Sequence, residues 1–118
     1  MDWKNAFDKD RELILATCSK SAEPNANIVI SLGFVDGKLL IGDYQMHKTI
    51  ENLKATKLIC IISKSDNHYL RAKGSVEVQN EGRYFDICQN ADKNYPAKNA
   101  ILVKIDEVIN LENQKKIL

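Results

Sequence analysis

The sequence predicts a mainly β protein, a closed antiparallel barrel of about five to seven strands with two or three short helices. Three observations support this fold class. Apolar, β-branched runs of strand length recur along the chain and are separated by turn-forming residues. Val35-Asp36-Gly37 is the strongest hairpin signal among those turns. Strands and helices do not alternate regularly, as a parallel α/β sheet would require.

The first part of the chain is expected to combine a short helix with several strands. Residues 3–11 trace about two turns of helix with an aromatic face, which we expect to close one end of the barrel. Residues 12–19 predict a largely buried strand. The continuous β-branched run 27–34 predicts a central strand, and the hairpin signal makes residues 39–41 its antiparallel neighbour.

The remaining elements follow from apolar periodicity. Helical spacing of apolar residues predicts a helix over 47–55, and a second short helix over 81–90. A buried strand is expected over 57–63 and a half-exposed, alternating strand over 69–78. The last strand is expected over 100–105, with 108–111 as an optional continuation.

Composition indicates one domain over residues 1–118. Apolar residues make up 44% and charged residues 28%, as in ordinary globular proteins. Seventeen basic and sixteen acidic side chains leave a net charge of +1, which disfavours nucleic acid as a partner. Neither a membrane-spanning run nor a signal-peptide core is present in the sequence. Three widely spaced cysteines predict a reduced, cytoplasmic protein with buried thiols.

Several kinds of catalytic or metal site are disfavoured by the motifs. The glycines form neither GxGxxG nor a phosphate-binding Walker loop, and GxSxG does not occur. His47 and His68 are the only histidines and have no partner at ligand spacing, so no metal site is expected. His68 is expected in a loop, and Cys60 is expected to be buried and inert.

An anion site is predicted where the chain enters the first long helix. Lys48 and Thr49 place a cation and a hydroxyl beside the free N–H groups of a helix N-terminus, which suits phosphate. By itself the dipeptide fits a simple cap and a solvated lysine equally well. Gly42 and Asp43 immediately upstream favour a ligand, because glycine permits close approach and a carboxylate can accept from a ring N–H or a ribityl hydroxyl.

Three segments resemble the flavin mononucleotide (FMN)-binding split-barrel family, the superfamily of pyridoxamine 5′-phosphate oxidase. They are Asp36-Gly37-Lys38-Leu39-Leu40-Ile41-Gly42-Asp43, Met46-His47-Lys48-Thr49 with Asn52-Leu53, and Arg71-Ala72-Lys73-Gly74-Ser75-Val76. The similarity runs in order from about Leu13 to Val108, and the small single-domain flavin-binding members are the most similar.

The resemblance implies a split-β-barrel homodimer, Greek-key-like, with FMN at the subunit interface. It assigns the phosphate to His47, Lys48 and Thr49. It assigns the isoalloxazine wall to a run in the predicted central strand, namely Asn27, Ile28, Val29 and Ile30. Contacts to the ring or ribityl chain fall to Gly42, Asp43 and Tyr44. Contacts from the partner subunit fall to Tyr69, Arg71 and the loop around Tyr95.

The activity implied is that of an FMN-dependent oxidoreductase acting on a small molecule, with a nicotinamide or other small redox partner. Such a protein needs no acid–base pair of its own, because the flavin carries the redox chemistry. His47 stands where pyridoxamine phosphate oxidases have arginine, and the chain lacks their Arg-rich C-terminal segment, so vitamin B6 oxidation is disfavoured. The alternatives are an electron carrier or flavin store, a binder of another phosphorylated ligand, and a deazaflavin or haem in place of FMN.

Overall fold

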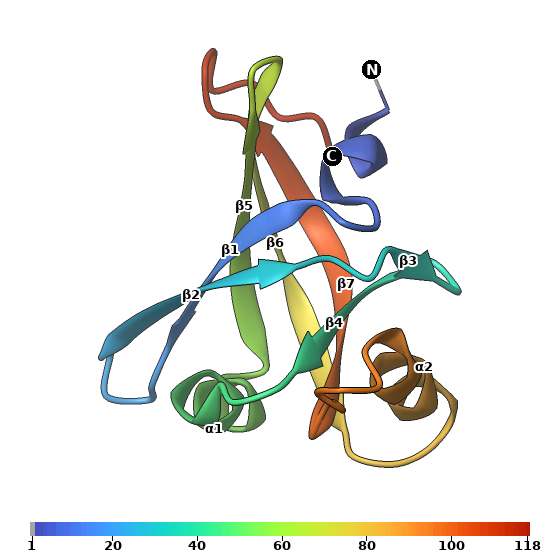
Figure 1. Ribbon diagram of the computed structural model, residues 1–118. Helices are drawn as coiled ribbons and strands as arrows, with labels where there is room; N and C mark the ends of the chain where they lie inside the picture. Colours follow the sequence, from blue (N-terminus) through green and yellow to red (C-terminus); the bar gives the residue numbers. More distant parts are fainter. Residues whose placement is uncertain (1) are drawn as a thin grey trace.

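The computed structural model describes residues 2–118, which form a curved seven-stranded antiparallel sheet with two α-helices (Figure 1). The elements in chain order are η1 (Trp3–Phe7), β1 (Glu12–Cys18), β2 (Pro24–Ile30), β3 (Phe34–Val35), β4 (Lys38–Asp43), α1 (His47–Thr56), β5 (Leu58–Ser65), β6 (His68–Gln79), α2 (Arg83–Ala91) and β7 (Asn99–Asn110). The strand order in the sheet is β2-β1-β5-β6-β7-β4-β3. Both α-helices lie at one end of the barrel and both chain termini near the other (Figure 1).

The sheet is not closed, so the predicted closed barrel is corrected to an open one with β2 and β3 at its edges. After β2 the backbone turns at Gly33, whose φ of +87° favours glycine, and this turn interrupts the strand before it can pair along β4. Two hydrogen bonds still bridge the gap. Leu32 N donates to the Leu40 carbonyl at 3.0 Å, and Leu40 N donates to the Gly33 carbonyl at 2.9 Å.

The predicted central strand 27–34 is also corrected. The structure has β2 over Pro24–Ile30, and β2 pairs along its length with β1 rather than with β4. The hairpin signal itself is confirmed, because Phe34 and Val35 pair with Leu39 and Lys38 across the Asp36-Gly37 turn. A β-branched run indicates a pleated surface that packs well, and edge strands can have that composition too.

The other predicted elements are confirmed with small shifts of their bounds. The helix expected over 47–55 is α1, which ends where Lys57 adopts the left-handed conformation and its N–H bonds to the Leu53 carbonyl at 2.9 Å. β5, β6 and α2 match their predicted segments, and β7 continues without interruption to Asn110. The N-terminal helix is a single 3-10 segment, Trp3–Phe7, shorter than expected.

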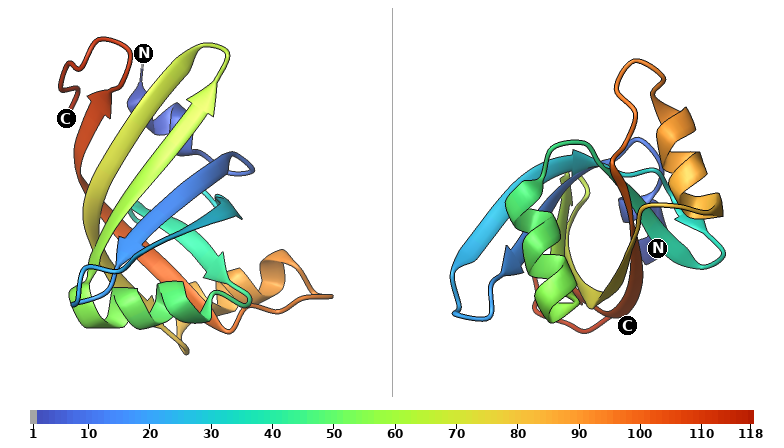
Figure 2. Two further views of the ribbon diagram at one scale, coloured as in Figure 1. Left: turned by 90° about the vertical axis from the view of Figure 1, so that its left-hand side faces the viewer. Right: turned by 90° about the horizontal axis from the view of Figure 1, so that it is seen from below.

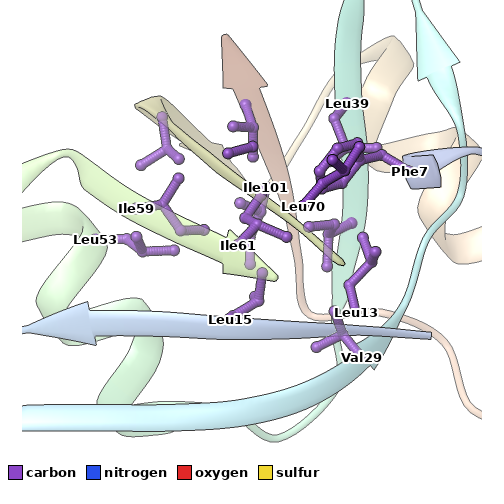
Figure 3. Close-up of a cluster of buried hydrophobic side chains, with 14 of the residues drawn as sticks. Phe7, Leu13, Leu15, Val29, Leu39, Leu53, Ile59, Ile61, Leu70 and Ile101 are labelled. Carbon is purple, nitrogen blue, oxygen red and sulfur yellow. The ribbon is translucent and has the colours of Figure 1, made fainter. Parts of the chain in front are cut away.

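The main core fills the inside of the curved sheet (Figure 3). Alternate residues of each strand point inward, as the period of a β-strand requires. Its largest fully buried side chains include Phe7, Leu13, Leu15, Leu39, Leu53, Ile61, Leu70 and Ile101. The 3-10 helix covers the end of this core, where Phe7 packs and its carbonyl accepts from the Ser31 hydroxyl at 2.7 Å. On the outside, α2 packs against β4 and β7 in a second cluster around Leu40 and Cys88.

His68 is buried at the start of β6, which corrects its predicted place in a loop. Its Nε2 lies 3.0 Å from Ser63 Oγ and its Nδ1 lies 2.8 Å from Ser65 Oγ. The Ser63 hydroxyl donates to the Ala6 carbonyl, so it accepts from Nε2–H, and Nδ1 accepts from Ser65. Loss of solvation on burial, helped by the charge of Arg11, lowers the pKa of His68 below its usual value.

The cysteines are less uniformly buried than the sequence suggested. Cys88 is buried, and the loss of solvation raises the pKa of its thiol to about 11. Cys60 is half-buried and Cys18 is exposed, so the prediction of buried thiols is wrong for both. Both residues point to the outer side of β1 and β5.

Candidate functional site

A cavity of about 530 Å³ lies beside β2, the end of β4 and the segment that leads into α1. Its wall contains several residues that were predicted to contact the flavin, namely Ile28, Val29, Ile30, Gly42 and Tyr44. Its other lining residues, Asp10, Leu32, Gln45, Met46, Ala91 and Asp92, were not predicted. The site therefore joins an edge strand to a helix entrance. Asp10, Ala91 and Asp92 were missed because they come from distant segments, whereas Leu32, Gln45 and Met46 adjoin predicted residues.

Edge strand β2 gives this cavity both apolar surface and backbone groups. Val29 points into the core, while Ile28 and Ile30 are 67% and 51% exposed. Only one side of β2 is paired, with β1, so alternate N–H and C=O groups along its other side have no partner strand. A planar heterocycle can pack on isoleucine and bond to such backbone groups at its edge.

The N-terminus of α1 has the features that were predicted for an anion site. No side chain of residues 2–118 caps it. Its first helical backbone bond runs from Ile50 N to the Met46 carbonyl at 2.9 Å, so the N–H groups of the preceding turn have no intrahelical acceptor. His47 and Lys48 in that turn are exposed. The cavity extends to Met46, which immediately precedes them.

Asp43 is buried at 3% exposure and is engaged within the chain. Its Oδ1 accepts from Met46 N at 2.8 Å, and its Oδ2 accepts from Asn99 Nδ2 at 2.8 Å. Its carbonyl accepts from Lys98 N at 2.7 Å. The sequence suggested a carboxylate that accepts from a ligand. In the structure the carboxylate holds β4, the helix entrance and the start of β7 in place, and its contact with a ligand stays a prediction.

Thr49 is also engaged, on the side of α1 that faces β2. Its hydroxyl donates to Asn27 Oδ1 and accepts from Asn25 Nδ2 at 2.9 Å. Asn27 therefore lies in a polar cluster between α1 and β2, outside the lining of the cavity. The backbone N–H of Thr49 still belongs to the open first turn. Asn25 was missed, although two asparagines at alternate positions of a strand already place their side chains on one face.

Tyr44 separates the first cavity from a second one. A Cβ built on Gly42 would lie 3.0 Å from Tyr44 Oη, so the glycine gives the phenol ring its space. Burial raises the pKa of Tyr44, with smaller contributions from Cys88 and Asp92, so the phenol is neutral at physiological pH. The second cavity, of about 650 Å³, shares Tyr44, Gln45 and Asp92 with the first.

The residues that were expected to act from a partner subunit lie apart from the first cavity. Tyr95 lines the second cavity and is 72% exposed. Tyr69 and Arg71 lie on the outer face of β6, where Arg71 neighbours Ile62 of β5 and Ile109 of β7. Arg71 Nε is buried and has no hydrogen-bond partner among residues 2–118. A buried donor without an acceptor costs free energy. An acceptor for Arg71 Nε would have to come from outside this chain.

An apolar patch covers part of the same outer face. We define the outer patch as Ile14, Ile28, Ile30, Leu58 and Ile62. The strand register places Ile14 opposite Ile28 on one side and opposite Ile62 on the other. Leu58, Ile28 and Ile30 are each more than half exposed. Exposed apolar surface of this kind is typical of interaction sites.

Comparison with known proteins identifies a relative and several proteins of the same fold. No protein-family model matches the sequence. The chain is 30% identical over 109 residues to the protein of Methanocaldococcus jannaschii described as uncharacterized protein MJ0282, covering 86% of this chain and 73% of that protein.

No helix within residues 2–118 has both the length and the apolar character needed to cross a bilayer.

Solved structures with the same fold include flavin-binding proteins. HupZ of Group A Streptococcus superposes with a TM-score of 0.85 at 17% identity, covering 98% of this chain and 95% of HupZ. An FMN-binding protein from Syntrophomonas wolfei gives 0.69 at 23% identity, covering 89% and 78%. A pyridoxamine 5′-phosphate oxidase-related, FMN-binding protein from Nostoc punctiforme gives 0.62 at 14% identity, covering 91% and 78%.

Proposed function

We propose, from the premise that the chain belongs to the same family as MJ0282 and has the fold of FMN-binding split-barrel proteins, that it is an FMN-binding oxidoreductase acting on a small molecule. The observation that carries this proposal is the cavity that joins edge strand β2 to the uncapped start of α1. One end of that cavity suits a planar apolar ring, and the other suits a phosphate group.

The residues present fit FMN when its parts are considered in turn. The isoalloxazine would lie against Ile28, Ile30 and the unpaired side of β2. Tyr44 would form the opposite wall. His47, Lys48 and the first-turn N–H groups would hold the phosphate. Bound flavin supplies hydride or electron transfer, while the protein binds it, orients it and limits access of water.

We further propose that the active form is a homodimer joined through the outer patch. The patch leaves isoleucines and a leucine in solvent, which association of two copies would remove. Arg71 borders the patch through its neighbour Ile62 and has a buried Nε without an acceptor. A second copy could bring that acceptor, or the flavin of the partner, to the guanidinium.

The test of the cofactor assignment compares FMN with riboflavin, which lacks the phosphate. FMN should bind the purified protein much more tightly in a fluorescence-quenching titration. Lys48→Ala should weaken FMN binding about tenfold to a hundredfold, because one charge-assisted hydrogen bond is worth about 1.5–3 kcal/mol. Lys54→Ala is the matched control, since Lys54 is an exposed lysine in the last turn of the same helix. Equal affinity for FMN and riboflavin would refute the phosphate site.

The test of the enzyme assignment asks what reduces the bound flavin. In the single chain the cavity is open to solvent, and a small-molecule substrate requires that such an opening to the flavin persist in the dimer. NADH, NADPH or a small quinone should exchange electrons with bound FMN in anaerobic stopped-flow experiments. If neither nicotinamide bleaches the flavin and only protein partners exchange electrons quickly, the protein is a carrier.

A further inference from the structure

The second cavity contains residues that the proposed flavin site does not use. Its volume is about 650 Å³, within the range of small-molecule sites. It adjoins the flavin cavity through shared lining residues, Tyr44, Gln45 and Asp92. The rest of its lining comes from the loop between α2 and β7, namely Asn94, Tyr95, Pro96 and Lys98. Figure 2 shows this loop projecting beyond the end of α2.

The loop is held in shape although its tip is exposed. Asp92 Oδ1 accepts from Asn94 N at 3.0 Å and from Tyr95 N at 3.3 Å. Gln89 Nε2 donates to the carbonyl of the buried Ala97 at 3.4 Å. The backbone that carries the exposed Tyr95 ring is therefore fixed on both sides. An aromatic ring held in this way is a ready surface for another ring.

The two charged side chains that line the second cavity differ in how far the protein already engages them. It contains one carboxylate, Asp92, whose Oδ1 already accepts two backbone bonds. It contains one ammonium group, that of Lys98, which makes no ion pair within residues 2–118. The backbone of Lys98 is fixed by the bond from its N–H to the Asp43 carbonyl. The two charges balance, but two backbone N–H groups partly offset the charge of Asp92, so the Lys98 cation beside aromatic walls favours an anionic aromatic ligand.

We infer that the second cavity binds a small planar aromatic carboxylate. The ring lies against Tyr95 and Tyr44, and the carboxylate pairs with Lys98. A molecule bound there sits across Tyr44 from the flavin cavity. Only the position of this molecule relative to the flavin depends on the proposed function. The second cavity itself is lined by protein residues alone and needs no cofactor to form.

The probe for this inference is 4-hydroxybenzoate, compared with 4-hydroxybenzamide, which has the same ring without the charge. Each is titrated into ¹⁵N-labelled protein, with and without FMN, and amide shifts are followed by NMR. Shifts should concentrate at residues 92–98 and at Tyr44 and Gln45. The amide should bind at least about tenfold more weakly than the acid, since it lacks the charge-assisted bond.

Lys98→Gln should weaken 4-hydroxybenzoate binding by a similar factor, whereas Lys93→Gln should not. Lys93 is the matched control, an exposed lysine of the same loop that does not line the cavity. Equal affinities for acid and amide, no effect of Lys98→Gln, or shifts confined to Ile28, Ile30 and Gly42 would each overturn the inference. Protein that fails to bind FMN but shows the predicted shifts would refute the proposed function alone. Protein that binds FMN without those shifts would refute this inference alone.

Discussion

The inner and outer faces of β1 and β5 carry similar side chains in different surroundings. On the inner face, Leu13, Leu15 and Ile61 are at most 1% exposed. On the outer face, Ile14 is 40% exposed and Leu58 is 64% exposed. Alternation along a strand places these two sets on opposite sides of one sheet. The chain covers one apolar face by itself and leaves the other exposed.

This difference separates residues that stabilise the single chain from residues that the proposed dimer would bury. Burial within the chain stabilises the monomer, while the outer patch contributes only when something covers it. Both faces carry large apolar side chains, so their presence alone does not distinguish the two roles. Substitutions on one face and then the other can separate them.

The largest expected effect is on the inner face. Leu15→Ala should lower the free energy of unfolding by about 3 kcal/mol, because it removes a fully buried side chain and leaves a cavity. Ile14→Ala, at the next position on the outer face, should change the unfolding of the monomer much less. Urea denaturation at low protein concentration measures both. Equal losses for the two variants would contradict the proposed division between the faces.

A second inner-face substitution tests crowding instead of a cavity. A Cβ on Gly74 would lie 2.1 Å from the Lys104 carbonyl oxygen, at the irregularity where β6 and β7 change register. Gly74→Ala should destabilise the protein by about 2 kcal/mol, since backbone has to move to admit the methyl group. Gly37→Ala provides a comparison, because its Cβ would meet no atom within 4 Å and only its positive φ opposes the change. Thermal unfolding of both variants would separate crowding from conformational strain.

On the outer face, a charge should disrupt association more than folding. Leu58→Glu should weaken dimer formation at least about tenfold, because it places a carboxylate in an apolar contact. Lys64→Glu, an exposed change on the same strand outside the patch, is the control. Sedimentation velocity across micromolar concentrations, with FMN present, would measure the equilibrium. A monomeric wild-type protein with FMN bound would reject the interface.

The smallest expected effect is the pH dependence of stability that comes from the buried ring of His68. Burial lowers the folded-state pKa of His68, so the unfolded chain binds its proton more readily. The stability contributed by neutral His68 is therefore present above its ordinary pKa of about 6.5 and is lost as the pH falls below that value. Denaturation midpoints from pH 7.5 to 5.5 should fall less for His68→Gln than for wild type. An unchanged slope in His68→Gln would contradict this expectation.

Local patterns predicted most elements, because hydrophobic period and turn chemistry act over a few residues. The Asp36-Gly37 turn and α1 are examples. Strand order was harder, because β2 carries the composition of a central strand yet occupies an edge. Its exposed isoleucines suit a surface that something else covers, and the sequence does not say whether that neighbour belongs to the same chain.

The candidate site also combines residues that are close in sequence with contacts between distant segments. Lys48, Gly42 and Tyr44 lie close in sequence, so their placement around one helix entrance could be predicted. The roles of Asp43 and Thr49 could not, because their partners Asn99 and Asn25 come from distant segments. The assignment of Tyr69 and Arg71 to a partner subunit stays a prediction, since it requires a second chain.

The bonds of Asp43 also bear on how quickly and tightly a phosphate ligand can bind. One residue fixes the last strand position before α1, the helix entrance and the start of β7. The entropy of ordering the first turn is therefore lost during folding, before any ligand arrives. Preorganisation of this kind lets more of the contact energy appear as affinity. Asp43→Asn would be expected to slow and weaken FMN binding through the loss of this order, whether or not the side chain also contacts the cofactor.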